Sequence, residues 1–144
     1  MRPNYFNNVH GVAIDPQTRE VYINDRGNHR IQIFDENGKF LRQWKINSEP
    51  SNIHFVYIGT DRKAWVFDNS TQKLAQYDLN GHLLYSWGSL GTFPGALWGA
   101  HGISVDQEGN LYLAMVGYGG VQKFHPRAGA NPNFLVGKPI KAAW

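Results

Sequence analysis

Cysteine and long apolar runs are both missing from this chain of 144 residues. Without cysteine there is no disulfide framework and no thiolate chemistry, so the redox compartment stays open. No run approaches the ~18–20 consecutive apolar residues that a membrane-spanning helix needs, so we expect no membrane partner. The opening residues, MRPNYFNN, lack the apolar core of a secretory signal. The localisation is therefore undetermined: cytoplasmic, or secreted if a leader is missing.

A concentration of positive charge is missing as well. The net charge is +3, and the 14 basic residues are scattered along the chain. The densest groups, Arg26/Arg30 and Arg62/Lys63, do not form a basic arm, so nucleic acid is not an expected partner. Hydrophobic residues make up 42% of the chain and charged residues 17%, which excludes a disordered chain and favours one compact domain over 1–144.

Short alternating runs fill the stretch from His10 to Trp44. The runs are HGVAID, EVYIN, RIQIFD and KFLRQW, and the polar segments DPQT, DRGNHR and ENG separate them. Val, Ile and aromatic residues with a period of two indicate β-strands, here near 11–15, 20–24, 30–34 and 40–44. Asn37-Gly38 predicts a primed hairpin turn with positive φ at both central residues. The stretch reads as one four-stranded antiparallel unit, the size of a propeller blade.

This unit recurs along the chain. Four residues are matched by aromatic or glycine residues 43 positions later: Tyr22, Phe34, Gly38 and Trp44 by Trp65, Tyr77, Gly81 and Trp87. A third copy begins at His101 with HGISVDQEGNLYLAMVGYGGVQKF. The later copies predict strands near 52–57, 63–67, 73–77 and 83–87, then near 102–106, 110–114 and 121–125. Only the residues FLV at 134–136 are candidates for a last strand. We therefore expect an all-β fold of three four-stranded blades, at about 9–47, 48–92 and 99–140.

Three blades are too few for a closed propeller, which usually has ~4–8. An open array leaves edge strands and a flank of the core exposed, which favours association. A homodimer of three plus three blades would close a six-bladed ring and bury both flanks. The alternative is that the chain is half of a longer protein.

The pattern HGVAID…VYINDRGNHRIQIFDENGKFLRQW resembles the NHL repeat, which is named after an Asn-His-Leu triplet. The matching triplet here is Asn28-His29-Arg30, which keeps the first two residues. The second copy, DNSTQKLAQYD, is a degenerate form, and the third has Met115 where the repeat has Asp. The resemblance implies a β-propeller and a structural role for His29.

A narrower resemblance is to bacterial proteins similar to peptidyl-α-hydroxyglycine α-amidating lyase, a six-bladed propeller. It rests on VHGVAID at 9–15, NDRGNHRIQIF at 24–34, and WGAHGISVD followed by VQKFHP up to 126. In that family, three histidines opening the innermost strands of alternate blades hold a channel zinc. His10 and His101 match this motif, so the resemblance implies that they are metal ligands, with Ser51 at the corresponding place in the second copy. Calcium is a further cofactor that the resemblance allows.

The resemblance also implies a chemistry and further site residues. A three-histidine zinc keeps an open position and can polarise a substrate hydroxyl. Arg26 matches an active-site arginine of the family and would hold a carboxylate. An ion pair of Arg26 with Asp25 or Asp35 is the alternative. Tyr118 is the candidate for the family's catalytic tyrosine. One chain supplies only two motif histidines. We therefore expect a scaffold that binds a peptide, small ligand or protein partner at the channel face through His10, Arg26 and His101. A zinc-dependent lyase is the alternative. The remaining histidines are expected to face solvent: His54, His82 and His125.

Overall fold

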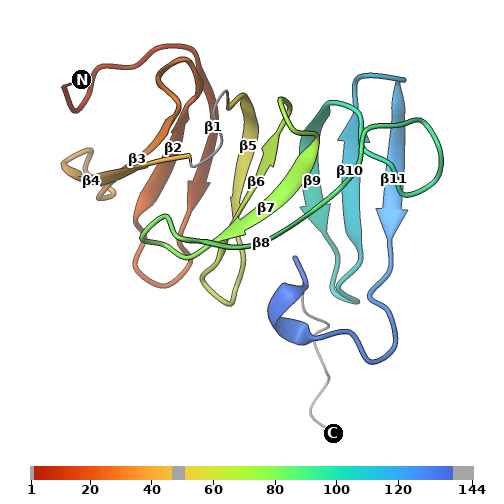
Figure 1. Ribbon diagram of the computed structural model, residues 1–144. Helices are drawn as coiled ribbons and strands as arrows, with labels where there is room; N and C mark the ends of the chain where they lie inside the picture. The colour runs from red at the N-terminus through yellow and green to blue at the C-terminus, as the bar shows by residue number, and fades with distance from the viewer. Residues whose placement is uncertain (1, 47–50, 138–144) are drawn as a thin grey trace, which may run out of the picture.

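The computed structural model describes residues 2–46 and 51–137, which form three antiparallel sheets (Figure 1). The first sheet holds β1 (Val9–Ile14), β2 (Val21–Asp25), β3 (Arg30–Phe34) and β4 (Phe40–Lys45). The second holds β5 (Ile53–Ile58), β6 (Ala64–Asp68), β7 (Lys73–Tyr77) and β8 (Leu83–Trp87). The third holds β9 (Ala100–Val105), β10 (Leu111–Met115) and β11 (Gly120–Phe124). Both ends of each strand lie within two residues of the prediction. No helix of the described residues is long and apolar enough to cross a membrane.

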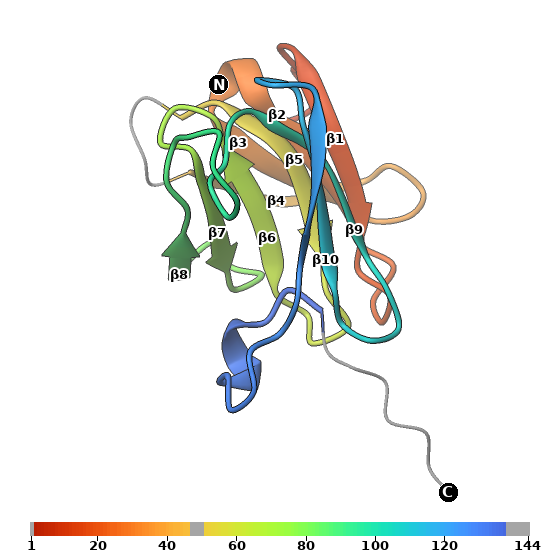
Figure 2. The same ribbon diagram turned by 90° about the vertical axis from the view of Figure 1, so that its right-hand side faces the viewer.

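The third sheet has three strands in the described residues, not the four that were expected. The candidate residues at 134–136 follow a 3-10 helix, η2 (Pro132–Phe134), which Asn131 caps by accepting the Asn133 N–H. This turn is anchored to the second sheet, because the Asn133 carbonyl accepts bonds from Lys63 and Gln76. The chain after β11 therefore runs below the third sheet, which faces the viewer in Figure 2, and β11 ends the sheet.

The turn between β3 and β4 differs from the primed turn expected at Asn37-Gly38. Only Gly38 has a positive φ, at 85°. The Gly38 N–H bonds the Asp35 carbonyl, and the Asp35 carboxylate accepts the N–H groups of Asn37 and Lys39. The extra residue appears as a bulge beside Phe34 in the pairing of β3 with β4. The turn is thus the longer hairpin loop in which one left-handed glycine precedes a bulge.

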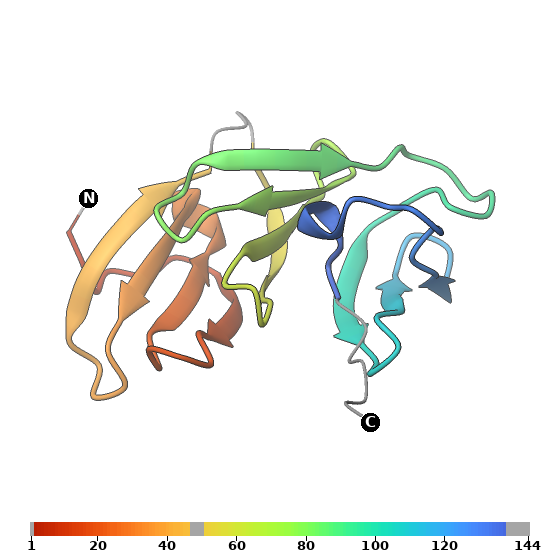
Figure 3. The same cartoon turned by 90° about the horizontal axis from the view of Figure 1, so that it is seen from below.

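Two apolar clusters join the three sheets, which spread like a fan in Figure 3. The period of two sends alternate residues of each strand to opposite faces, so every sheet can pack on both sides. The first cluster joins the first and second sheets and includes Tyr22, Ile33 and Val56. The second joins the second and third sheets and includes Trp65 and Leu113. The first strands of the three sheets are β1, β5 and β9. In space, β1 lies next to β5, and β5 lies next to β9.

Candidate functional site

Three histidines meet where the three first strands lie side by side. His10, His54 and His101 are each the second residue of their strand, in β1, β5 and β9. The imidazole centroid of His10 lies 5.5 Å from those of both His54 and His101, and the last two are 3.8 Å apart. The strand repeat therefore builds one cluster of three imidazoles on the inner strands.

Gly11 allows β1 to approach β5 closely beside this cluster. A Cβ atom at Gly11 would lie 3.3 Å from the Cα atom of Phe55, which is tighter than most contacts of a real Cβ. A glycine after His10 therefore suits the close approach of two backbones. On β5 the residue after His54 is Phe55, whose buried ring instead belongs to the core between the second and third sheets.

Backbone carbonyls orient all three rings. The Nδ1 atom of His10 lies 2.6 Å from the His54 oxygen, that of His54 3.2 Å from the Ala100 oxygen, and that of His101 3.1 Å from the Gly99 oxygen. A carbonyl oxygen only accepts, so in each bond Nδ1 is the donor and carries the proton. An uncharged imidazole that carries its proton on Nδ1 keeps the Nε2 lone pair for a ligand.

His54 is the most enclosed of the three, with 5% of its surface exposed. Burial first, and then the electrostatic repulsion that a protonated His101 would exert, lower its pKa to about 4. His10 and Arg26 act in the same direction, whereas the bond to the Ala100 carbonyl opposes the shift. At neutral pH the His54 ring is therefore uncharged and offers a hydrogen-bond acceptor.

Arg26 begins the short 3-10 helix η1 (Arg26–Asn28), directly after β2. Its half-buried side chain forms no ion pair with any residue that the structure describes. The preceding Asp25 pairs with Arg30 instead, at 2.7 Å. η1 packs against β1, the strand of His10. The Arg26 charge also acts weakly to lower the pKa of His54.

Tyr118 lies in a different environment, on the connection between β10 and β11. Its half-buried ring packs against the core between the second and third sheets. Its hydroxyl accepts a bond from the Gln122 amide at 2.8 Å. The structure thus brings together His10 and His101, whereas no contact recorded for Tyr118 reaches either of them. A catalytic role for Tyr118 stays a prediction.

The expectation that His54 faces solvent is wrong, and Ser51 is not the counterpart of His10. The Ser51 carbonyl instead accepts a bond from Nδ1 of His29, at 2.7 Å. The sequence does contain a signal for His54: HGVAI, HFVYI and HGISV share a histidine followed by alternating aliphatic residues. The connection before β5 has one residue more than a strict 43-residue repeat allows. His54 therefore lies one position beyond the place that this repeat predicts. His82 and His125 are exposed, as expected.

A three-histidine metal centre does not fit this arrangement. No group of three or more His, Cys, Asp and Glu side chains within 2–46 and 51–137 is placed to hold a metal ion. The resemblance also implied alternate blades, whereas the three histidines come from consecutive sheets. Metal binding by His10 and His101 stays a prediction.

Comparison with known proteins identifies the repeat and the fold. The family model for the NHL repeat matches residues 6–34. The fold is that of a β-propeller, and residues 6–34 match one NHL repeat. Human NHL repeat-containing protein 3 is 39% identical over 61 residues, which are 40% of this chain and 17% of that protein.

Solved structures with the same architecture include two enzymes. Virginiamycin B lyase from Staphylococcus aureus, in a catalytically inactive histidine-to-alanine form with quinupristin, has a TM-score of 0.63 and 16% identity. The match covers 89% of this chain and 44% of the lyase. A luciferin-regenerating enzyme has a TM-score of 0.54 and 15% identity, over 75% of this chain and 37% of the enzyme. At these identities the likeness shows the fold alone, and the chain spans less than half the length of each relative.

Proposed function

We propose that the chain is a propeller scaffold that binds a ligand at the inner face of its three sheets. The observation that carries the proposal is the convergence of His10, His54 and His101, with each Nδ1 atom held by a backbone carbonyl. Such anchoring fixes ring orientation before a ligand arrives, which lowers the entropy cost of binding. Arg26 contributes a cation from η1, which packs against β1.

The chemistry of these groups defines the ligand. Neutral imidazoles with free Nε2 atoms accept hydrogen bonds, and a guanidinium donates two parallel bonds to a carboxylate. A molecule with a carboxylate next to an N–H or O–H group satisfies both requirements. The free C-terminal end of a peptide has this combination, as do small hydroxy or amino acids. We therefore propose a carboxylate-bearing peptide or small molecule, which a protein partner with an exposed C-terminus can also present.

The first experiment uses two forms of one tripeptide, with a free carboxyl end and with a carboxamide end. Imidazole resonances of the ¹⁵N-labelled protein are followed during titration at pH 7. We expect the carboxyl form to shift the Nε2 resonances of the three clustered histidines. The carboxamide form should bind at least about tenfold more weakly, because it lacks the charge that Arg26 recognises.

Matched variants test the assignment of the site. His54→Gln and Arg26→Gln should each weaken binding of the carboxyl form about tenfold or more. His82→Gln is the control, because His82 is exposed and pairs with Asp78 on the turn between β7 and β8. Equal affinity for the two peptides, or equal loss in His82→Gln, would contradict the proposal.

The second candidate is the metal-dependent lyase that the resemblance implies. The observation in its favour concerns His10 and His101 alone: each donates Nδ1–H to a backbone carbonyl, as metal-bound histidines commonly do. Metal content of the purified protein is measured together with glyoxylate release from a peptidyl-α-hydroxyglycine. One zinc per chain, lost in both His10→Ala and His101→Ala, would support the lyase. A metal-free protein that binds the carboxyl peptide would support the scaffold alone.

The same proposal includes a homodimer with three plus three sheets. Two copies of the inner strands would line one channel, and its wall would carry two histidine clusters. A ring of six sheets is within the range of closed propellers. The channel would then hold the ligand between the copies.

A further inference from the structure

Each sheet has two faces. We call the face on the side of the preceding sheet its first face, and the face on the side of the following sheet its second face. In the first cluster, the second face of the first sheet meets the first face of the second sheet, for example Ile31 against Val56. In the second cluster, the second face of the second sheet meets the first face of the third, for example Leu74 against Leu113. The strand register shows which residues share a first face. Val12 pairs with Ile23 in the first sheet, Val56 with Val66 in the second, and Ile103 with Leu113 in the third.

Two faces have no sheet against them in the described residues. The first open face belongs to the first sheet: Val12, Ile14, Val21, Ile23 and Phe34. The second open face belongs to the third sheet: Gly102, Ser104, Ala114, Val121 and Lys123. Val12, Ile14 and Val121 are 63%, 54% and 69% exposed. Val12 and Ile14 lie on the same face of β1, so the first open face exposes neighbouring apolar side chains.

The chain itself shows what covers a first face. Tyr77 ends the first face of the second sheet, and Trp44 of the preceding sheet stacks on it at 5.3 Å. Phe124 has the same place in the third sheet, and Trp87 packs against it at 5.3 Å. Phe34 is the equivalent residue of the first sheet. Its ring contacts Phe6 and Phe40 at 5.9 and 5.7 Å, without any residue of a preceding sheet.

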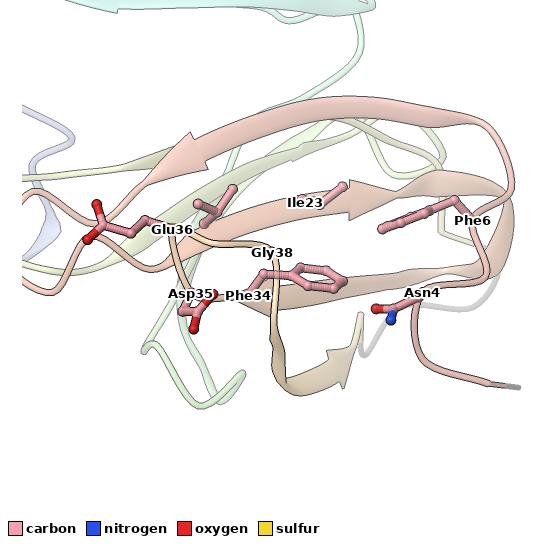
Figure 4. A pocket seen from close by; sticks show the side chains of 8 residues that line it. Asn4, Phe6, Ile23, Phe34, Asp35, Glu36 and Gly38 are labelled. Carbon is pink, nitrogen blue, oxygen red and sulfur yellow. The ribbon is translucent and has the colours of Figure 1, made fainter.

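The first open face is also hollowed. A cavity of about 380 Å³ lies beside Phe34, with Phe6 and Ile23 on its apolar side and Asp35 and Glu36 at its rim (Figure 4). The second open face presents Lys123, whose ammonium lies 5.3 Å from the ring centroid of Tyr112. The two faces belong to the two sides of one repeating contact.

We infer that the second open face of one copy docks on the first open face of another, and that two such seams close the ring. Within the chain, the first face of each later sheet is covered by the second face of the sheet before it. The third sheet of a second copy supplies such a face to the first sheet, so the occupant is a second copy. Val12 and Val121 would take the places of Val56 and Ile31 at the seam. The inner strands would continue across it, with His10 of the second copy beside His101. This inference rests on the proposed ring and identifies the surfaces that form it.

The test is native mass spectrometry and light scattering of the full chain at about 50 µM. We expect a species of twice 16.3 kDa for the wild type. Val12→Glu and Val121→Glu should each give monomers, because each buries a charge at both seams. Leu83→Glu is the control, since Leu83 is 49% exposed on β8, away from both open faces, and should stay dimeric.

A mixture of the two monomeric variants distinguishes this geometry from its alternatives. A heterodimer of Val12→Glu with ¹⁵N-labelled Val121→Glu has one seam free of substitutions, so mixed dimers should return at higher concentration. A dimer that tolerates Val121→Glu would instead join two first faces, and would overturn the inference. A wild-type monomer would overturn it too, and would indicate that further sheets belong to a longer chain. Peptide binding by Arg26 and the histidines is measured separately, and its loss alone would leave the seams intact.

Discussion

Burial and neighbouring imidazoles decide the protonation of His54. The ring is enclosed by Phe67 at 5.9 Å and by the rings of His10 and His101. The folded protein therefore disfavours the imidazolium, and the pKa falls to about 4. The unfolded chain binds that proton near pH 6.5, so protons favour unfolding between these two values.

The first prediction follows from this difference. Lowering the pH from 7 to 5 should reduce the free energy of unfolding by about 2 kcal/mol through His54 alone. His54→Gln should lose less over the same range, because glutamine does not titrate. Urea unfolding at both pH values measures the two differences. An equal loss in both proteins would show that His54 is not the titrating group.

Asp25 and Arg30 form a buried ion pair that anchors the segment before β1. Their side chains are 0% and 3% exposed and lie 2.7 Å apart. Asp25 also accepts the Asn7 N–H, and Arg30 donates to the Tyr5 carbonyl. The repeated Asp thus holds backbone amides, as in the second sheet, where Asp68 accepts the Asn52 N–H.

The second prediction concerns this pair. Asp25→Ala should destabilise the fold by about 3–5 kcal/mol, because it leaves the Arg30 charge buried without its partner. Glu36→Ala is the control: it removes a pair with Arg19 whose side chains are 52% and 67% exposed, and should cost under about 1 kcal/mol. Urea unfolding compares the two, and similar losses would contradict the argument.

At the scale of the element, the hairpin turns at the end of β3 and β7 have the same shape but different surroundings. Gly38 and Gly81 have φ values of 85° and 90°. A Cβ at Gly38 would meet nothing within 4 Å, whereas one at Gly81 would lie 2.5 Å from Cγ of Trp44. The second turn is therefore part of the contact between sheets, and the first is not.

The third prediction compares the two glycines. Gly38→Ala should cost ~1–2 kcal/mol, which is the cost of a left-handed alanine. Gly81→Ala should cost a further ~1–3 kcal/mol, because the indole of Trp44 must move. Thermal unfolding of both variants gives the difference, and near-ultraviolet circular dichroism should report the disturbed Trp44 only in Gly81→Ala. Equal stability of the variants would exclude the contact.

At the scale of the whole molecule, the two open faces make stability depend on association. A dimer that forms only from folded chains shifts the unfolding equilibrium by mass action. The fourth prediction is that the thermal midpoint of the wild type rises with protein concentration between 1 and about 100 µM. Val12→Glu should show no such rise, and Leu83→Glu should behave as the wild type. A midpoint independent of concentration in all three proteins would contradict closure by a second copy.

Local pattern determined most of the fold. Alternating aliphatic and aromatic residues, Gly38 and Gly81 in the turns, and the 43-residue repeat were enough to predict the strands within two residues. These features depend on steric preferences and on burial of one side chain in two, which act within a single strand or hairpin. His10 and His101 were predicted as site residues by resemblance, because each stands in an HG pair that matches the motif of the amidating-lyase family.

Only the tertiary structure decided the rest. His54 joins the cluster because β5 packs between β1 and β9, and a one-residue difference in loop length hides that match from a fixed period. The path of 132–137 depends on bonds to residues far away in sequence, from Lys63 and Gln76 to the Asn133 carbonyl. The place of Tyr118 depends on packing against the core between the second and third sheets. Likewise, whether another sheet covers a given face depends on how the sheets pack. The spacing of residues along the chain does not determine it.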